Sequence, residues 1–494
     1  MQLIIIGGGF SGIGMAIRLR QRGMNDFVIL ERARDLGGTW RDNSYPGCAC
    51  DVQSSLYSFS FAPNPDWSRT FSPQAEIWEY LRRCVERFDI ARHVVYEQEV
   101  TGAAWDDATR QWSVTATGGR WTADALVIAT GPLSDPVLPE IPGLASFAGP
   151  SFHSAQWNHE VALQGKRVAV IGTGASAIQF VPQIQPAVKQ LSLFQRTPAW
   201  VMPRFDRAVP AWRRSLYRRM PAAQRVERAA LYALRELMFL PFRHKRAARV
   251  VEWVAKRHLA AQVADPMLRA KLTPSYTIGC KRILVSDDYF PAVAQPNVDL
   301  VTDHVRAVVA DGVVTDDGRL HPADVIIFGT GFRATDPPIA PRVVGRHGTT
   351  LATAWRGSPA AYMGTTEAGF PQPVLPAGSQ HGLGPQLRDA HGRGADRACA
   401  RGADPPAEAR RRRGRAEPSA EAQARWVRWV HERLAPTVWN SGGCRSWYLD
   451  RNGRNSTLWP ENVGRFRRMV TRPVEADYVL SRRGAPGARV PAPG

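Results

Sequence analysis

Two glycine-rich turns in this 494-residue chain have the GxGxxG spacing that brings backbone N–H groups close to a phosphate. In the first, Gly7, Gly9 and Gly12 follow the apolar run 3–6, which is typical of a buried parallel strand, and they open a helical pattern. The N-terminus of such a helix adds its dipole to an anion site. Glu31 ends the next apolar run and is placed to accept a hydrogen bond from a ribose hydroxyl. The segment therefore predicts a site for a dinucleotide whose ribose hydroxyls carry no phosphate.

The second turn repeats this pattern with a different ending. Gly172, Gly174 and Ala177 fill the GxGxxG/A positions after the predicted strand 168–171. The next predicted strand, 191–194, ends not in an acid but in the polar triplet Gln195, Arg196 and Thr197. An arginine at this point suits the 2′-phosphate of NADPH, which an acid would repel. A solvated loop charge is the alternative interpretation of Arg196.

Two further apolar runs indicate how the nucleotide units are connected. Segments 123–131 and 323–332 each read as a buried strand that ends in a small-residue turn. We expect an α/β fold with two Rossmann-like dinucleotide-binding domains, in which the second domain is inserted into a discontinuous first one. The expected boundaries are 1–145 and 329–480 for the first domain, 146–328 for the second with a helical insertion at 205–274, and a disordered tail at 481–494.

The net charge of +20 suggests polyanionic partners, such as nucleic acid, an anionic membrane or phosphate-bearing cofactors. No zinc-finger spacing or aromatic single-strand-binding pattern accompanies the charge, so nucleic acid is not expected. An arginine-rich composition is also typical of a GC-rich genome. No metal ligands are predicted.

The six cysteines form no CxxC pair, and in so long a chain they predict no disulfide framework. They are interpreted as reduced thiols of a cytosolic protein: Cys48, Cys50, Cys84, Cys280, Cys399 and Cys444. The chain starts almost directly with a strand, and no apolar run approaches the roughly 20 residues of a membrane helix. A cytoplasmic location is therefore expected.

Beyond these turns, the chain resembles the class B flavoprotein monooxygenases, and within them the Baeyer–Villiger type. The segments 37–40 and 45–47, with Asp51, fit that family's pattern [AG]GxWxxxx[FY]P[GM]xxxD. The fingerprint FxGxxxHxxxW is matched between the two nucleotide turns by Phe147, Gly149, His153 and Trp157. Asn158 follows where the family usually has Pro or Asp, which leaves plain sulfur or nitrogen oxygenation open. A disulfide reductase would need a redox cysteine pair after Gly38, and Trp40 stands there instead.

The resemblance implies FAD in the first site and NADPH in the second. NADPH would reduce the flavin, O2 would add to form a C4a-peroxyflavin, and the peroxide would attack a ketone to yield an ester or lactone. By resemblance Arg282 is the cation beside the peroxide, since a guanidinium stays charged. Asp51 would position Arg282 and contact the nicotinamide, and Lys281 would reach the NADP phosphate with Arg196 and Thr197. Further flavin contacts are expected from Gly38, Trp40, Tyr57 and Val100, and His153 is interpreted as a hinge residue.

The helical insertion combines apolar stripes with many arginines. An ordinary packed subdomain is favoured, and a surface resting on a membrane is the alternative. The small organic substrate and the oligomeric state are left open.

Segment 371–416 lacks any strand or helix periodicity and is rich in Gly, Pro and Arg. Reading its codons from the second base allows a buried strand, a Gly-Pro-Asn turn and an amphipathic helix, which resembles what the family carries there. We favour a frameshift over a genuine linker. If it is a frameshift, an inactive flavoprotein is a third functional alternative, because buried arginines would disrupt the FAD domain.

Overall fold

The computed structural model describes residues 1–238, 245–371, 373–374, 415–471 and 474–481. Its first parallel sheet has the strand order β19-β7-β1-β2-β3. The central strand β1 (Leu3–Ile6) pairs with β2 (Phe27–Leu30) on one side and β7 (Ala125–Ile128) on the other, and α1 (Phe10–Gln21) follows β1 directly. The two outer strands are short, β3 (Val94–Val95) and β19 (Pro373–Val374).

Both faces of this sheet are covered, because successive side chains of a strand point to opposite faces. Leu3 and Ile5 pack with residues of α1 and of α3 (Gln74–Arg87). Ile4 and Ile6 pack with a second, mostly antiparallel layer. That layer is built from β4 (Val100–Asp106), β5 (Gln111–Ala116), β6 (Gly119–Ala123) and β18 (Val343–Val344).

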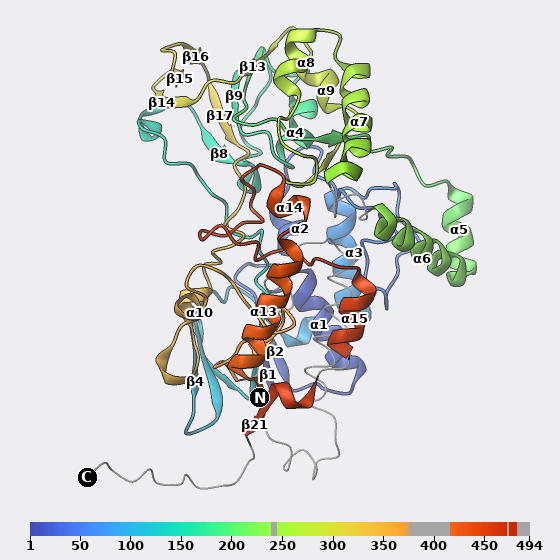
Figure 1. Ribbon diagram of the computed structural model, residues 1–494, viewed down its shortest axis with the longest axis vertical. Coiled ribbons are helices and arrows are strands. Elements are labelled where there is room, and N and C mark those ends of the chain that lie inside the picture. The colour runs from blue at the N-terminus through green and yellow to red at the C-terminus, as the bar shows by residue number, and fades with distance from the viewer. Residues whose placement is uncertain (239–244, 372, 375–414, 472–473, 482–494) are drawn as a thin grey trace.

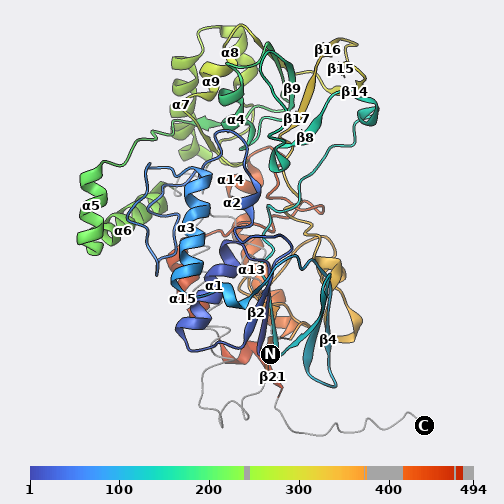
Figure 2. The same ribbon diagram turned by 180° about the vertical axis from the view of Figure 1, so that it is seen from behind.

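The second parallel sheet lies between β7 and β19 in sequence, and its strand order is β13-β10-β9-β17-β8. These strands are β8 (Ser151–His153), β9 (Arg167–Ile171), β10 (Gln190–Phe194), β13 (Val298–Val301) and β17 (Val325–Phe328). One face packs on α4 (Ala177–Ile184) and α9 (Tyr289–Val293), and the other packs on the small sheet β14 (Val305–Val309), β15 (Gly312–Thr315) and β16 (Leu320–Pro322). Figures 1 and 2 show the two sheets in separate halves of the molecule.

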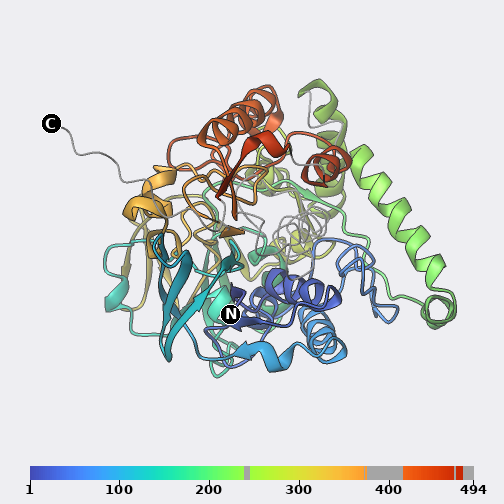
Figure 3. The ribbon, with the colours of Figure 1, turned by 90° about the horizontal axis from the view of Figure 1, so that it is seen from below.

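The insertion into the second unit is helical, as predicted. It consists of α5 (Ala211–Arg219), α6 (Pro221–Met238), α7 (Lys245–Gln262) and α8 (Pro266–Leu272), and the short strands β11 (Val201–Met202) and β12 (Leu284–Val285) pair on either side of it. Figure 3, seen from below, shows green helices of this insertion along the outer edge of the molecule. None of the helices described is both long and apolar enough to span a membrane.

The C-terminal part packs around buried aromatic residues. It contains β20 (Arg415–Pro418), α13 (Ala420–Leu434), α14 (Val438–Ser441), α15 (Val463–Thr471) and β21 (Tyr478–Ser481), and α10 (Leu351–Trp355) precedes it. Trp426, Trp459 and Phe466 form its buried core. The predicted tail beyond residue 481 and most of the segment interpreted as frameshifted lie outside the described residues.

The interpretation of all six cysteines as reduced thiols is wrong for one pair. Cys280 and Cys444 form a disulfide across 164 residues of sequence, with a Cα–Cα distance of 6.1 Å. Sequence spacing could not reveal this pair, because the two segments meet only when the C-terminal part packs against the second nucleotide unit. Cys48, Cys50 and Cys84 are free and buried.

Candidate active site

The first glycine turn forms a backbone cradle at the end of β1. Gly7 has a φ of +102°, and a Cβ built on it would lie 2.8 Å from the carbonyl oxygen of Ala129, so this position requires glycine. Gly9 lies against Gly38, whose added Cβ would approach the Cα of Gly9 to 3.1 Å. Gly12 lies in the first turn of α1. Because the glycines of this turn have no side chains, the backbone N–H groups at the N-terminus of α1 are open to a ligand, and the turn fits the diphosphate of FAD.

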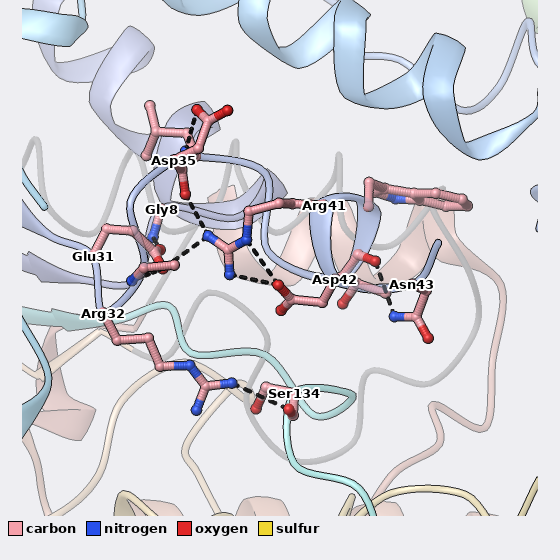
Figure 4. Close-up of polar contacts among 12 residues, drawn as sticks. Gly8, Glu31, Arg32, Asp35, Arg41, Asp42, Asn43 and Ser134 are labelled. Carbon is pink, nitrogen blue, oxygen red and sulfur yellow. Dashed lines mark hydrogen bonds and ion pairs between the residues drawn. The ribbon is translucent and has the colours of Figure 1, made fainter. Parts of the chain in front are cut away.

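Glu31 closes the far side of this cradle. Its Oε2 accepts the Gly8 N–H at 2.7 Å, and its Oε1 lies 3.1 Å from Arg41 Nη1. Figure 4 shows the carboxylate between Gly8 and Arg41, with Arg32 reaching toward Ser134 nearby. The buried carboxylate is therefore fixed at the end of β2, where a ribose would be bound. Arg41 directly follows the predicted contact Trp40, but no motif in the sequence indicated a role for it.

The expected flavin contacts Trp40 and Tyr57 come together in the structure. Trp40 Nε1 donates to Tyr57 Oη at 2.9 Å, and the two rings meet edge to face with centroids 5.3 Å apart. Both side chains are buried beside α1 and α3. Val100 lies at the start of β4 in the core on the opposite face of the sheet, and its carbonyl accepts from Arg342.

The second glycine turn repeats the geometry of the first. Gly172 has a φ of +107°, and its added Cβ would lie 2.5 Å from the carbonyl oxygen of Gly329, just after β17. Gly174 lies beside the same carbonyl, and Ala177 begins α4. In both units the turn thus packs against the small-residue turn that ends a neighbouring strand. Gln195 is buried and donates to the carbonyl of Lys271 at 2.8 Å, so its side chain links the end of β10 to α8.

Arg196 and Lys281 approach each other although they are 85 positions apart in sequence. Burial lowers the pKa of Lys281, and the charge of Arg196 lowers it further. The Lys281 ammonium also lies 5.1 Å from the centroid of the Tyr276 ring. Arg196 is exposed and Thr197 is half-buried at the end of β10. Two neighbouring cations fit a phosphate, which would relieve their repulsion.

Asp51 and Arg282 form a bidentate ion pair across 231 residues of sequence. Arg282 Nε lies 2.9 Å from Asp51 Oδ2, and Arg282 Nη2 lies 2.8 Å from Oδ1 and 2.6 Å from Oδ2. Asp51 raises the pKa of the Arg282 guanidinium, which therefore stays protonated. Burial is the largest single effect on the pKa of Asp51 and would raise it, but the charge and hydrogen bonds of Arg282, with smaller effects, together outweigh burial and lower it. The Arg282 side chain keeps 36% of its surface exposed, so the paired guanidinium can still meet a ligand.

Two residues that no sequence motif indicated complete this cluster. Arg235 of α6 donates to Gln53 Oε1 at 2.6 Å, and its charge lowers the pKa of Asp51. Tyr448 is buried beside the ion pair, and burial raises the pKa of its hydroxyl to about 12. The arginine-rich insertion and the aromatic C-terminal segment were the available signals, but neither indicated which residue would reach Asp51.

His153 of the fingerprint lies at the end of β8 with 1% of its surface exposed. Its Nδ1 accepts the N–H of Ala155 at 3.1 Å, and burial lowers its pKa to about 4. It is therefore neutral at pH 7. Of the cysteines near the first glycine turn, Cys48 and Cys50 are both buried free thiols.

Comparison with known proteins identifies the family. Residues 1–347 match the family model described as flavin-binding monooxygenase-like. The chain belongs to this family. A Baeyer–Villiger monooxygenase of Streptomyces coelicolor is 50% identical to this flavin-binding monooxygenase, with 98% of this chain and 93% of that protein aligned. A Pseudomonas aeruginosa protein of the same name is 47% identical, with 95% and 89% aligned.

Two solved structures are similar to the whole of this flavin-binding monooxygenase. Cyclohexanone monooxygenase from a Rhodococcus species, bound to NADP+, has a TM-score of 0.85 and 28% identity over 97% of this chain and 99% of that one. Oxidised steroid monooxygenase bound to NADP has the same TM-score and identity, over 98% and 99%. The predicted family, the α/β fold with two Rossmann-like domains, and an FAD- and NADPH-dependent monooxygenase are confirmed.

Proposed function

We propose that this flavin-binding monooxygenase converts ketones into esters or lactones, and that the Asp51–Arg282 pair carries this activity. The overall reaction would consume one ketone, O2, NADPH and a proton, and would release the ester, NADP+ and water. FAD bound in the first site would pass electrons from NADPH to O2 and so supply the chemistry that activates the oxygen. The relatives named Baeyer–Villiger monooxygenase and the cyclohexanone-bound structural neighbour support this substrate class.

Arg282 is proposed as the residue that stabilises negative charge on the reacting oxygens. Its guanidinium is held in one orientation by Asp51, and its raised pKa keeps it protonated at any pH the fold survives. A fixed cation next to an oxygen that gains charge lowers the barrier without reorganising during the reaction. Asp51 is a positioning residue in this scheme, and its contact with the nicotinamide is part of the proposal.

The remaining predicted residues are proposed as cofactor ligands. FAD would be held by Gly7, Gly9, Gly12, Glu31, Gly38, Trp40, Tyr57 and Val100. NADPH would be held by Gly172, Gly174, Ala177, Gln195, Arg196, Thr197 and Lys281. The domain boundaries after residues 145 and 328 belong to the same proposal, as does a cytoplasmic location, where NADPH is available.

The test is turnover of cyclohexanone under ¹⁸O2, followed by mass spectrometry of the product. We expect caprolactone with one ¹⁸O atom in the ring and an unlabelled carbonyl oxygen. An Arg282→Ala variant should still oxidise NADPH but release hydrogen peroxide in place of lactone. Arg282→Lys is the matched control for charge without the bidentate geometry. Full lactone formation by Arg282→Ala would overturn the role of Arg282.

A screen with methyl phenyl sulfide distinguishes the proposed ketone oxygenation from the alternative, heteroatom oxygenation. Wild-type enzyme that oxygenates the sulfide but makes no lactone from any ketone would overturn the proposed ketone substrate. An enzyme that binds no flavin would overturn both.

A further inference from the structure

Helix α6 carries an apolar face on its outside, which we call the outer face. At about 100° per residue, its members span an arc of roughly 140° that contains no charged residue. All are exposed: Ala222, Val226, Ala229, Ala230, Ala233, Leu234 and Leu237. Val226 and Leu237 keep 69% and 62% of their surface exposed. A surface helix normally packs such a stripe against the core, whereas α6 exposes its apolar stripe to solvent.

The opposite face of α6 holds the helix to the body through polar contacts. Arg228 donates to the carbonyl of Ser55 at 2.8 Å, and Arg235 donates to Gln53 Oε1 at 2.6 Å. Three further polar side chains outside the outer face also bond to the body: Gln224, Glu227 and Glu236. These bonds fix the orientation of α6, so the fold itself presents the outer face to the outside. Figure 1 shows the helix at the edge of the molecule.

The charge around the outer face identifies its partner. Residues 205–274 contain sixteen Lys and Arg against five Asp and Glu, which gives +11 of the chain's total of +20. Arg225 is exposed beside the outer face, whereas the two acids that flank the arc, Glu227 and Glu236, are half-buried and hydrogen-bonded to the body. Trp212 of the adjacent α5 is 68% exposed, and tryptophan is enriched where protein meets the lipid–water boundary. An apolar helical face bordered by cations is typical of a helix that lies on an anionic membrane.

A second copy of this chain fits the outer face less well. In such a dimer two insertions, each with a net charge of +11, would face each other, and their repulsion opposes association. The outer face has seven residues, four of them alanine, whereas a stable dimer interface needs about 20–30 residues on each side.

We propose that the outer face of α6 docks this enzyme on an anionic lipid surface. The apolar side chains would enter the headgroup boundary, and the neighbouring arginines would lie against lipid phosphates. The same helix reaches the Asp51 cluster through Arg235 on its other face, so the docked insertion lies between the lipid surface and the candidate active site.

The test is flotation of the full-length, flavin-loaded enzyme with vesicles. One set contains phosphatidylcholine alone and the other contains phosphatidylcholine with 30 mol% phosphatidylglycerol, at about 50 and 500 mM salt. We expect binding to the anionic vesicles, weakened by salt. The double variant Leu234→Glu/Leu237→Glu should partition at least tenfold more weakly. Leu320→Glu, an exposed leucine on β16, is the matched control and should bind like wild type.

Flavin content and turnover of a water-soluble ketone confirm that each variant is folded. If the glutamate variant loses flavin, Leu234→Ser/Leu237→Ser replaces it with the same expected direction. Absence of wild-type binding to anionic vesicles would overturn the proposal. So would undiminished binding of a folded double variant, because basic residues alone would then explain the attraction. A concentration-dependent dimer in light scattering that the double variant abolishes would assign the outer face to a second copy instead.

Discussion

Arg235 places a second guanidinium beside the Asp51–Arg282 pair, so the cluster carries two positive charges and one negative charge. Burial lowers the pKa of Arg235, and the charge of Asp51 opposes that effect. Without Arg235, the negative charge of Asp51 would act on Arg282 alone. The cluster would then present no net charge to an oxygen that becomes anionic.

Replacing Arg235 is therefore expected to slow ester formation. We expect Arg235→Gln to lower kcat about tenfold, equivalent to about 1.4 kcal/mol, with little change in the KM for the ketone. Arg235→Lys should recover most of the rate because it restores the charge. Arg225→Gln on the outer side of the same helix is the control and should leave kcat for a soluble ketone unchanged. Equal loss in the Lys and Gln variants would indicate a packing role instead.

The Arg196–Lys281 pair predicts the choice between NADPH and NADH. We expect Arg196→Ala and Lys281→Ala each to raise the KM for NADPH about tenfold, because each removes a cation that would face the 2′-phosphate. The KM for NADH, which lacks this phosphate, should change little. Steady-state kinetics with NADPH and with NADH measure the ratio of the two KM values. An equal increase in the KM for NADH would show that these residues stabilise the fold rather than bind the 2′-phosphate.

At the scale of elements, a buried carboxyl joins α10 to α13. Glu367 keeps 3% of its surface exposed and accepts hydrogen bonds from Gln423 Nε2 at 2.7 Å and from Trp355 Nε1 at 3.3 Å. Burial raises its pKa to about 8, against the effect of these two bonds. The folded protein thus keeps this acid neutral at pH 7, whereas the unfolded chain ionises it near its usual pKa of about 4.3.

This difference predicts a stability that falls as pH rises. Between about pH 4.5 and 8 the folded state binds one proton more than the unfolded state. The free energy of unfolding should therefore decrease by about 1.4 kcal/mol per pH unit from this group. Glu367→Gln should remove that slope, seen as a growing difference in Tm from wild type between pH 5 and 8. Glu421→Gln, an exposed acid of α13, is the control. Parallel pH profiles of wild type and Glu367→Gln would contradict the prediction.

At the scale of the whole molecule, the Cys280–Cys444 disulfide ties the C-terminal part to the segment that carries Arg282. The Thr277 N–H also donates to the Gly442 carbonyl at 3.0 Å, so the two segments pack directly. Because the crosslink closes a 164-residue loop, we expect Cys444→Ser to lower the free energy of unfolding by about 2–4 kcal/mol. Peptide mapping without reductant should recover the linked pair, and two free thiols there would contradict the prediction.

The frameshift proposed for segment 371–416 would affect the whole molecule, because this segment belongs to the expected FAD-binding domain. Nucleotide sequencing across codons 371–416 is expected to show a displaced base, and restoring the frame should raise the flavin content of the purified protein. An uninterrupted gene, or unchanged flavin content after restoration, would show that the segment is genuine. This prediction concerns residues that lie mostly outside the described part of the chain.

Local geometry explains why the nucleotide turns could be predicted from sequence. A backbone at φ above +100° that approaches a carbonyl oxygen within 3 Å requires glycine, so Gly7 and Gly172 are visible in the sequence itself. The apolar strands before them and the Glu31 and Arg196 endings follow from the same short-range pattern. The family motifs likewise indicated Asp51 and Arg282 before any distance was known.

Contacts between distant segments were decided only by the tertiary structure. Cys280 meets Cys444 across 164 residues, and Arg235 and Tyr448 join Asp51 from an insertion and from the C-terminal part. The apolar stripe of α6 was visible in the sequence, but a helical period does not say which side of a helix faces the core. Polar bonds from Arg228 and Arg235 turn that stripe outward, because they satisfy buried groups of the 53–58 loop that an apolar face could not.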